Sequence, residues 1–148
     1  MNPRSTNYIV FECLSRSANE ASARGAVACF AAQLDPTLEE LGDIKTAVSE
    51  AVTNAIVHAY PDTLGRVVVK ARVLGEDVLE ISVRDWGQGI ADIDKARQPL
   101  FTTGGEERSG MGFTIMESFM DSLTVRSAPG QGTRVTMRRR IRSRRPLP

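Results

Sequence analysis

Three polar side chains recur at helical spacing in the middle of the chain. Glu50, Asn54 and His58 stand four residues apart, so a helix would carry them on one stripe. The residues around the stripe are apolar, which predicts that its polar atoms lie at the edge of a core or in a cleft. A carboxylate and an amide placed this way can orient a hydroxyl group and bind a hard cation. For His58 we expect support of the helix end, with no direct part in the chemistry.

Two glycine-containing motifs could add to a ligand site. In Asp85-Trp-Gly87-Gln-Gly89 the aspartate can accept a hydrogen bond from an amino group, and the glycines let the backbone approach a flat ligand. Gly110-Met-Gly112 precedes an expected helix and would present backbone N–H groups to phosphate oxygens. Each motif alone has a plain structural explanation, as a hairpin turn or as a loop before a helix. Together with the helical stripe, and in this order, they form a specific set.

Alternating apolar residues predict the strands that would position these motifs. Strands are expected at residues 8–14, 66–74, 78–84, 123–127 and 133–140. Gly75-Glu-Asp77 joins the second strand to the third, which predicts a hairpin. Asp85 would then follow directly on the third strand.

Capping-box sequences predict where two helices begin. Residues 17–20 predict a helix that ends near residue 33, and residues 37–40 predict the longer helix that carries the stripe to about residue 60. A third helix is expected over residues 113–119, a single helical turn within 92–97, and a mobile loop over 99–109.

The order of these elements predicts an α/β (α+β) two-layer sandwich. We expect a mixed, mostly antiparallel sheet with the helices packed on one face. A chain of 148 residues fits one domain, which we place at residues 1–141, with a basic tail at 142–148.

Composition limits the function classes. A net charge of +1 with 25% charged residues does not point to nucleic acid or to a membrane. The C-terminal arginines leave a nucleic-acid-binding protein as an alternative, which would show steeply salt-dependent binding. Cys13 and Cys29 lack metal or redox spacing and are expected to be buried thiols in a reducing compartment. No signal-peptide pattern or membrane-length apolar run is present, so we expect a cytoplasmic protein.

The three motifs resemble the GHKL superfamily of ATP-binding domains, which gyrase B, MutL and histidine kinases share and which has the Bergerat fold. Within it the chain is most similar to the anti-sigma-F factors, the serine-protein kinases of sporulation. The segments that carry the resemblance are residues 19–24, 33–37, 48–58, 99–103 and 107–117. The resemblance covers nearly the whole chain apart from the basic tail.

The resemblance implies ATP or ADP and Mg²⁺ as cofactors and assigns roles to single residues. Asn54 would bind Mg²⁺, Glu50 would act as general base or orienter, and Arg108 would stabilise the terminal phosphate. Asp85 would bind the adenine amino group. The other residues implied to contact the nucleotide are Gly87, Gly89, Thr103, Ser109, Gly110, Met111, Gly112, Phe113 and Thr133.

The resemblance also implies protein partners. It predicts an anti-sigma factor that binds a sigma factor and phosphorylates a serine of an anti-anti-sigma protein with a STAS domain, acting as a homodimer. Arg24 would contact these partners, and neither nucleic acid nor a membrane is expected. The alternative is an ATP-dependent sigma-binding module without kinase activity. A histidine kinase is not favoured, because His58 lies inside the predicted nucleotide-binding helix.

Overall fold

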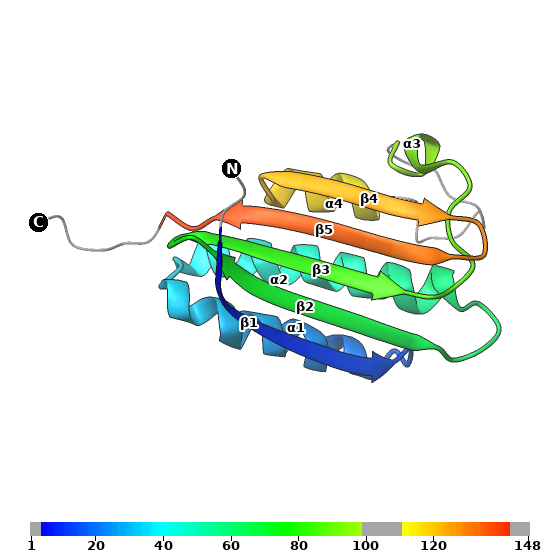
Figure 1. The fold of residues 1–148 in the computed structure, drawn as a ribbon, viewed down its shortest axis with the longest axis horizontal. Coiled ribbons are helices and arrows are strands. Elements are labelled where there is room, and N and C mark those ends of the chain that lie inside the picture. Colours follow the sequence, from blue (N-terminus) through cyan, green and yellow to red (C-terminus); the bar gives the residue numbers. More distant parts are fainter. Residues whose placement is uncertain (1–3, 99–110, 143–148) are drawn as a thin grey trace, which may run out of the picture.

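The computed structural model describes residues 4–98 and 111–142, and its elements follow the predicted order (Figure 1). The strands are β1 Ser5–Leu14, β2 Arg66–Leu74, β3 Val78–Asp85, β4 Ser122–Ala128 and β5 Gly132–Arg140. The α-helices are α1 Asn19–Ala31, α2 Leu38–Asn54, α3 Ile93–Ala96 and α4 Gly112–Phe119. The loop predicted over 99–109 lies outside the described residues.

The five strands form one sheet in the order β1-β2-β3-β5-β4. All four strand pairs of the described sheet are antiparallel, so the predicted fold class is confirmed and the sheet has no parallel pair. The predicted hairpin joins β2 to β3, with Gly75 at a φ of 61° in its turn. On the other side of β3, Asp85 pairs with Thr133 of β5. The central strand therefore ends at the predicted ligand-binding carboxylate.

Helices α1, α2 and α4 cover one face of the sheet, as predicted (Figure 1). Their apolar sides pack against the alternate residues of β2, β3 and β5 in a single core. Fully buried side chains at its centre are Val27, Ile44, Val48, Val52, Val67, Val69, Ile81, Met116 and Met137. Helix α2 lies in the middle of this layer, so one of its sides is left to carry polar groups at the margin of the core.

The N-terminus of α2 has the predicted capping box. The Thr37 hydroxyl accepts a hydrogen bond from the Glu40 N–H, and the Glu40 carboxylate accepts one from the Thr37 N–H. The capping box predicted at Ser17 is wrong, because α1 begins at Asn19 without a side-chain cap. Backbone carbonyls of the preceding turn take over, and Ser17 accepts from the Glu20 N–H through its carbonyl oxygen.

The C-terminal end of the long helix changes its winding. After Asn54 the chain continues as one π-helical turn, Ala55–Ala59, and leaves the helix at Tyr60. The predicted end near residue 60 is therefore correct, but the last five residues are more widely wound than an α-helix. This π-turn points its final carbonyl groups toward the segment that follows β3.

The other face of the sheet carries none of the described helices and is rich in basic residues. The cations that alternate with the core residues along β2, β3, β4 and β5 are Arg66, Lys70, Arg72, Arg84, Arg126, Arg134, Arg138 and Arg140. We call these eight residues the basic outer face. Among the described strand residues, Glu12 and Glu80 are carboxylates on the same face, and Glu80 is buried.

Both cysteines are reduced, but they are not the buried pair that was predicted. Cys13 is partly buried in β1, while Cys29 is exposed because it lies on the solvent side of α1. Burial, with the nearby charge of Glu12, raises the pKa of the Cys13 thiol. In the described ranges no helix combines the length and apolarity that a membrane-spanning segment requires.

Candidate functional site

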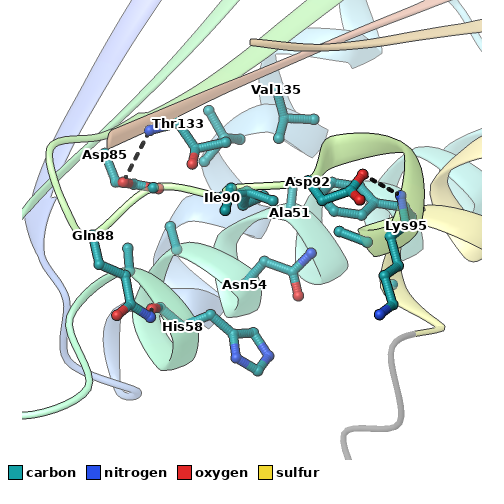
Figure 2. A pocket seen from close by; sticks show the side chains of 18 residues that line it. Ala51, Asn54, His58, Asp85, Gln88, Ile90, Asp92, Lys95, Thr133 and Val135 are labelled. Carbon is teal, nitrogen blue, oxygen red and sulfur yellow. Dashed lines mark hydrogen bonds between the residues drawn. The ribbon is translucent and has the colours of Figure 1, made fainter. Parts of the chain in front are cut away.

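A cavity of about 430 Å³ lies between the second half of α2 and the ends of β3 and β5 (Figure 2). Its walls include six of the predicted site residues, namely Asn54, Asp85, Gly89, Gly112, Phe113 and Thr133. They come from α2, β3, the loop after β3, α4 and β5, which are distant in the sequence. The volume is in the range of small-molecule sites, roughly 300 to 1,000 Å³. The fold thus brings the three sequence motifs to one cavity.

Asp85 is the buried acid of the cavity, with 6% of its surface exposed. Its Oδ1 accepts hydrogen bonds from the Gly87 N–H at 2.9 Å and from the Thr133 N–H at 3.2 Å. Both bonds end on Oδ1, so Oδ2 stays available to a ligand in the cavity. Burial raises the pKa of Asp85, and the two backbone donors reduce this rise without cancelling it. A ligand donor at Oδ2 would add to the stabilisation of the ionised form.

The glycines after Asp85 allow close backbone contacts. A Cβ at Gly87 would overlap the carbonyl of Ala59, and one at Gly89 would overlap the carbonyl of Ala128. Gly89 also has a φ of 76°, a conformation that favours glycine. Gly89 lines the cavity, whereas Gly87 lies behind the wall, against the π-turn. Gly87 therefore shapes the site through packing and through its N–H bond to Asp85.

Thr133 belongs to a small network of hydroxyl groups at the edge of the cavity. Its Oγ1 lies 2.8 Å from the Ser127 Oγ, which also accepts the Ile90 N–H at 2.8 Å. The Ser127 hydroxyl is within hydrogen-bond distance of the Gly132 carbonyl as well, at 2.9 Å. These bonds fix the loop after β3 against the β4–β5 hairpin. Ser127 is a supporting residue that the sequence motifs did not indicate.

Glu50 and Asn54 lie one helical turn apart and meet the start of α4. A Cβ on Gly112 would lie 3.0 Å from Asn54 Nδ2 and 3.4 Å from Glu50 Oε1. A glycine at this position therefore lets the first turn of α4 approach both polar side chains. Figure 2 shows the Asn54 amide pointing into the cavity. The stripe and the second glycine motif therefore lie next to each other in the structure.

Glu50 does not line this cavity but a second, more open depression of about 360 Å³. Arg24 of α1 lines the same depression, together with Gly42, Lys45, Thr46 and Ser49 of α2. We call it the α1–α2 groove. The Arg24 guanidinium is 3.6 Å from the Glu20 carboxylate, one turn earlier in α1. Arg24, the predicted partner-contact residue, and Glu50, the predicted base, thus line the same groove. This groove lies on the side of α2 opposite to Asp85.

The remaining predicted residues have different outcomes. Thr103, Arg108, Ser109 and Gly110 lie outside the described residues. Met111 precedes α4 and is not part of the cavity wall, whereas Phe113 is buried in that wall.

Several wall residues had not been singled out from the sequence. They are Ala51, Gln88, Ile90, Asp92 and Lys95. His58, which was expected to support the helix end, also lines the cavity. Gln88 lies inside the Asp-x-Gly-x-Gly motif and Ala51 lies within the polar stripe's helix, so both could have been found by position. Lys95 comes from the short helix α3, for which the sequence offered only a local turn signal. The His58 backbone carbonyl accepts a hydrogen bond from Gln88 Nε2 at 2.6 Å.

The cavity wall combines apolar side chains with polar groups. The buried Asp85 carboxylate and the Thr133 hydroxyl lie on one side, and the Asn54 amide, from the end of α2, lies near the N-terminus of α4. Within the described ranges no group of three or more His, Cys, Asp and Glu side chains could hold a metal ion. A hard cation in this cavity would be bound by the Asn54 carbonyl oxygen together with oxygens of a ligand.

Comparison with known proteins shows the family of the chain. Residues 14–139 match the model of the histidine kinase-like ATPase domain. An anti-sigma F factor of Thermoanaerobacter sp. (strain X514) is 57% identical over 93% of this chain and 96% of its own length. The anti-sigma F factor of Pasteuria penetrans is 56% identical over 94% of each chain, and one from Clostridium perfringens (strain SM101) is 52% identical over 91% of this chain and 97% of its own.

Solved structures show the same fold at low sequence identity. The RsbU and RsbW domains of a Mycobacterium tuberculosis protein match with a TM-score of 0.66 at 20% identity, over 92% of this chain and 32% of that one. This chain thus spans about a third of that protein. The mycobacterial sensor histidine kinase MprB matches with a TM-score of 0.58 at 15% identity, over 93% of this chain and 99% of that one. The cavity motifs, the fold and the full-length similarity lead to one conclusion: the chain belongs to the histidine kinase-like ATPase domain family, and within it to the anti-sigma F factors.

Proposed function

We propose that this protein binds a sigma factor and uses Mg²⁺-ATP to phosphorylate a serine of the STAS-domain antagonist that would release the sigma factor. The observation that carries the proposal is the position of Gly112 close to both Glu50 and Asn54. It joins the end of the nucleotide cavity to the α1–α2 groove, so that a phosphate and an acceptor could meet there. The anti-sigma F names of the relatives support the sigma factor as partner.

The cavity fits a nucleoside triphosphate with its base at the Asp85 end. Asp85 Oδ2 would accept the adenine amino group, and Thr133 would assist from β5. Gly89 keeps the wall close to the flat base. At the other end the phosphates would lie at the N-terminus of α4, where the helix dipole favours negative charge. Asn54 would bind the Mg²⁺ ion that reduces the charge on the phosphates.

Glu50 is suited to orient the acceptor hydroxyl or remove its proton. Its carboxylate is half-buried next to the start of α4, and it opens to the groove rather than to the adenine compartment. An acceptor serine entering from the groove would meet Glu50 before it met the phosphates. Arg24 and Lys45 in the same groove would attract acidic residues beside that serine. Arg108, Thr103, Ser109 and Gly110 keep their proposed phosphate-side roles.

A binding module without kinase activity is the second candidate. It is favoured by the openness of the α1–α2 groove, which suits a large protein surface as well as a substrate loop. A passive nucleotide site would not require a carboxylate at position 50, so Glu50 separates the two candidates.

Glu50→Gln is the test. Wild type is incubated with Mg²⁺, labelled ATP and a folded STAS-domain antagonist, and phosphoserine is measured. We expect the variant to lose about a hundredfold or more of the phosphotransfer rate, while its ADP and sigma affinities stay within about twofold. Glu39→Gln, an exposed glutamate in the first turn of the same helix, is the control and should keep full activity.

Two results would contradict the kinase proposal. One is a wild-type protein that forms no phosphoserine although the antagonist binds. The other is a Glu50→Gln variant that phosphorylates at the wild-type rate. An equal loss of phosphotransfer, ADP binding and sigma binding would assign Glu50 a structural role instead.

A further inference from the structure

The hydroxyl group of Tyr60 connects three parts of the fold next to the cavity. The Trp86 N–H donates to Tyr60 Oη at 2.7 Å, and the Tyr60 hydroxyl donates to the Arg66 carbonyl at 2.8 Å. The last paired residues of β2 and β3 are Val67 and Asp85, so Arg66 and Trp86 would be the next pair. The hydroxyl bridges these two backbone groups. The chain after Asp85 is thereby led away from β2 and toward the cavity.

The ring of Tyr60 is held in place by Gly65. A Cβ on Gly65 would overlap three atoms of the ring, so the ring lies directly on this glycine. Gly65 is in turn fixed to the end of β1, because its N–H donates to the Ser15 hydroxyl at 2.9 Å and its carbonyl accepts the Ser15 N–H at 2.8 Å. Ser15 is buried. The packing of the ring on Gly65, and the hydrogen bonds of Gly65 to Ser15, therefore fix the position of the Tyr60 hydroxyl.

The rest of the segment is fastened to the same helix end. The Gln88 N–H donates to the Ala59 carbonyl at 3.0 Å, and Gln88 Nε2 donates to the His58 carbonyl at 2.6 Å. Gly87 packs on Ala59. Three consecutive residues, 58 to 60, thus hold the three residues that follow Asp85. This attachment sets the position of the Asp85 end of the cavity relative to the helix that carries Asn54.

Trp86 itself is turned out of the cavity. Its indole ring lies between two guanidinium groups, with Arg66 at 4.0 Å and Arg84 at 4.7 Å from the ring centroid. The residue is 39% exposed. Because its side chain points to the basic outer face, only its backbone is available to fix the course of the loop, and that backbone donates to Tyr60.

We infer that Tyr60 is a positioning residue for recognition of the adenine base, acting through the Trp86 N–H on the Asp85 carboxylate. The inference rests on the proposed nucleotide site. Without the hydroxyl the Trp86 N–H and the Arg66 carbonyl lose their bridge, and the loop that orients Asp85 relaxes. Tyr60 touches neither the base nor the phosphates, so its loss affects discrimination of the base more than binding of the phosphates.

Tyr60→Phe tests this role, since it removes the hydroxyl and keeps the ring on Gly65. ADP and inosine diphosphate, which lacks the adenine amino group, are titrated into wild type and variant by calorimetry with Mg²⁺ present. We expect the ADP affinity of Tyr60→Phe to fall about fivefold to tenfold, and its preference for ADP over inosine diphosphate to fall about threefold or more. Thermal melts establish that the variant is folded.

Tyr8→Phe is the matched control, because Tyr8 is the other tyrosine of the chain and lies exposed on β1, 61% accessible. It should leave both affinities unchanged. Equal weakening of the two nucleotides by Tyr60→Phe would indicate a purely structural role and overturn the inference, as would unchanged affinities. If wild type showed no preference for ADP, the adenine site at Asp85 would itself be wrong, and this inference would fail with it.

Discussion

At the scale of single residues, Asp85 illustrates how burial and function are linked. Burial disfavours the ionised form of its carboxylate, and hydrogen bonds from two backbone N–H groups compensate only part of this cost in the described structure. A raised pKa means that the folded state holds the proton more strongly than the unfolded chain does. The contribution of Asp85 to stability is therefore greatest below the ordinary aspartate pKa of 3.8 and is lost as pH rises through the folded pKa.

Asp85→Asn is expected to separate binding from stability. The amide oxygen can take over the bonds from Gly87 and Thr133, which directs the amide NH₂ into the cavity, where it would face the donor group of adenine. ADP affinity should fall at least about tenfold. Because the neutral amide has no charge to bury, the free energy of unfolding at pH 7 should be equal to or above that of wild type.

Calorimetry and urea denaturation measure the two quantities. Asp94→Asn, on the exposed side of α3, is the control and should change neither. Retention of wild-type ADP affinity in Asp85→Asn would remove Asp85 from the site.

At the scale of elements, α2 begins with a capping box and is followed by a π-helical turn. The capping box at Thr37 satisfies two N–H groups at its N-terminus, far from the cavity. At its C-terminal end the π-turn and Tyr60 bind the loop after β3, and the polar residues Glu50 and Asn54 lie between. The residues that stabilise the start of α2 and those proposed to bind a ligand are therefore located at different parts of one helix.

Thr37→Ala is expected to lower stability without changing ligand affinity. Loss of an N-cap oxygen costs about 1 kcal/mol of unfolding free energy. Urea denaturation followed by circular dichroism measures this loss, and Thr37→Ser, which keeps the oxygen, should recover most of it. The ADP affinity of Thr37→Ala should remain within about twofold of wild type. A larger change would mean that the cap also controls the cavity.

At the scale of the whole molecule, charge is distributed unevenly although the net charge is only +1. The basic outer face gathers eight cations on one side of the sheet. Buried Glu80 is at its centre and accepts hydrogen bonds from Arg72 Nε at 2.6 Å and Arg138 Nε at 2.8 Å. Burial raises the pKa of Glu80, but the two guanidinium groups outweigh burial and the net pKa is lowered. This carboxylate links β2, β3 and β5 across the face.

Glu80→Gln should make the protein less stable at neutral pH and less sensitive to acid. Since the folded pKa of Glu80 is lowered, its stabilisation is present above the ordinary glutamate pKa of 4.5 and is lost as pH falls through the folded pKa. At pH 7 the variant should lose about 1 to 2 kcal/mol of unfolding free energy. Below the folded pKa of Glu80 the difference from wild type should shrink.

Urea denaturation across this pH range measures both effects. Glu12→Gln is the comparison, because Glu12 pairs with Arg66 at 3.4 Å with both side chains more than half exposed, and it should have little effect. If the unfolding free energy of Glu80→Gln depended on pH as that of wild type does, the hydrogen bonds of Glu80 with Arg72 and Arg138 would not stabilise the fold.

Local patterns in the sequence were sufficient to predict most of the helices and strands and to indicate the family. Strand alternation, the Thr37 capping box and the hairpin turn depend on residues close in the chain, and they predicted the five strands, the long helix and the helix-covered face. The resemblance in three motifs indicated the family, which the comparisons confirm. The domain limits, the homodimer and the cytoplasmic location stay predictions.

Only the tertiary structure decided how the motifs meet. Gly112 lies close to Glu50 and Asn54, and Tyr60 bonds to Trp86, so residues of different elements meet at both places. The burial of Asp85 also depends on the packing of several elements around it. The exposure of Cys29 likewise depends on which side of α1 faces the sheet. The capping box at Ser17 fails for a local reason, because the Ser17 backbone carbonyl accepts the Glu20 N–H in place of the side chain. A sequence pattern specifies the face of an element, but which groups come within bonding distance depends on how the elements pack.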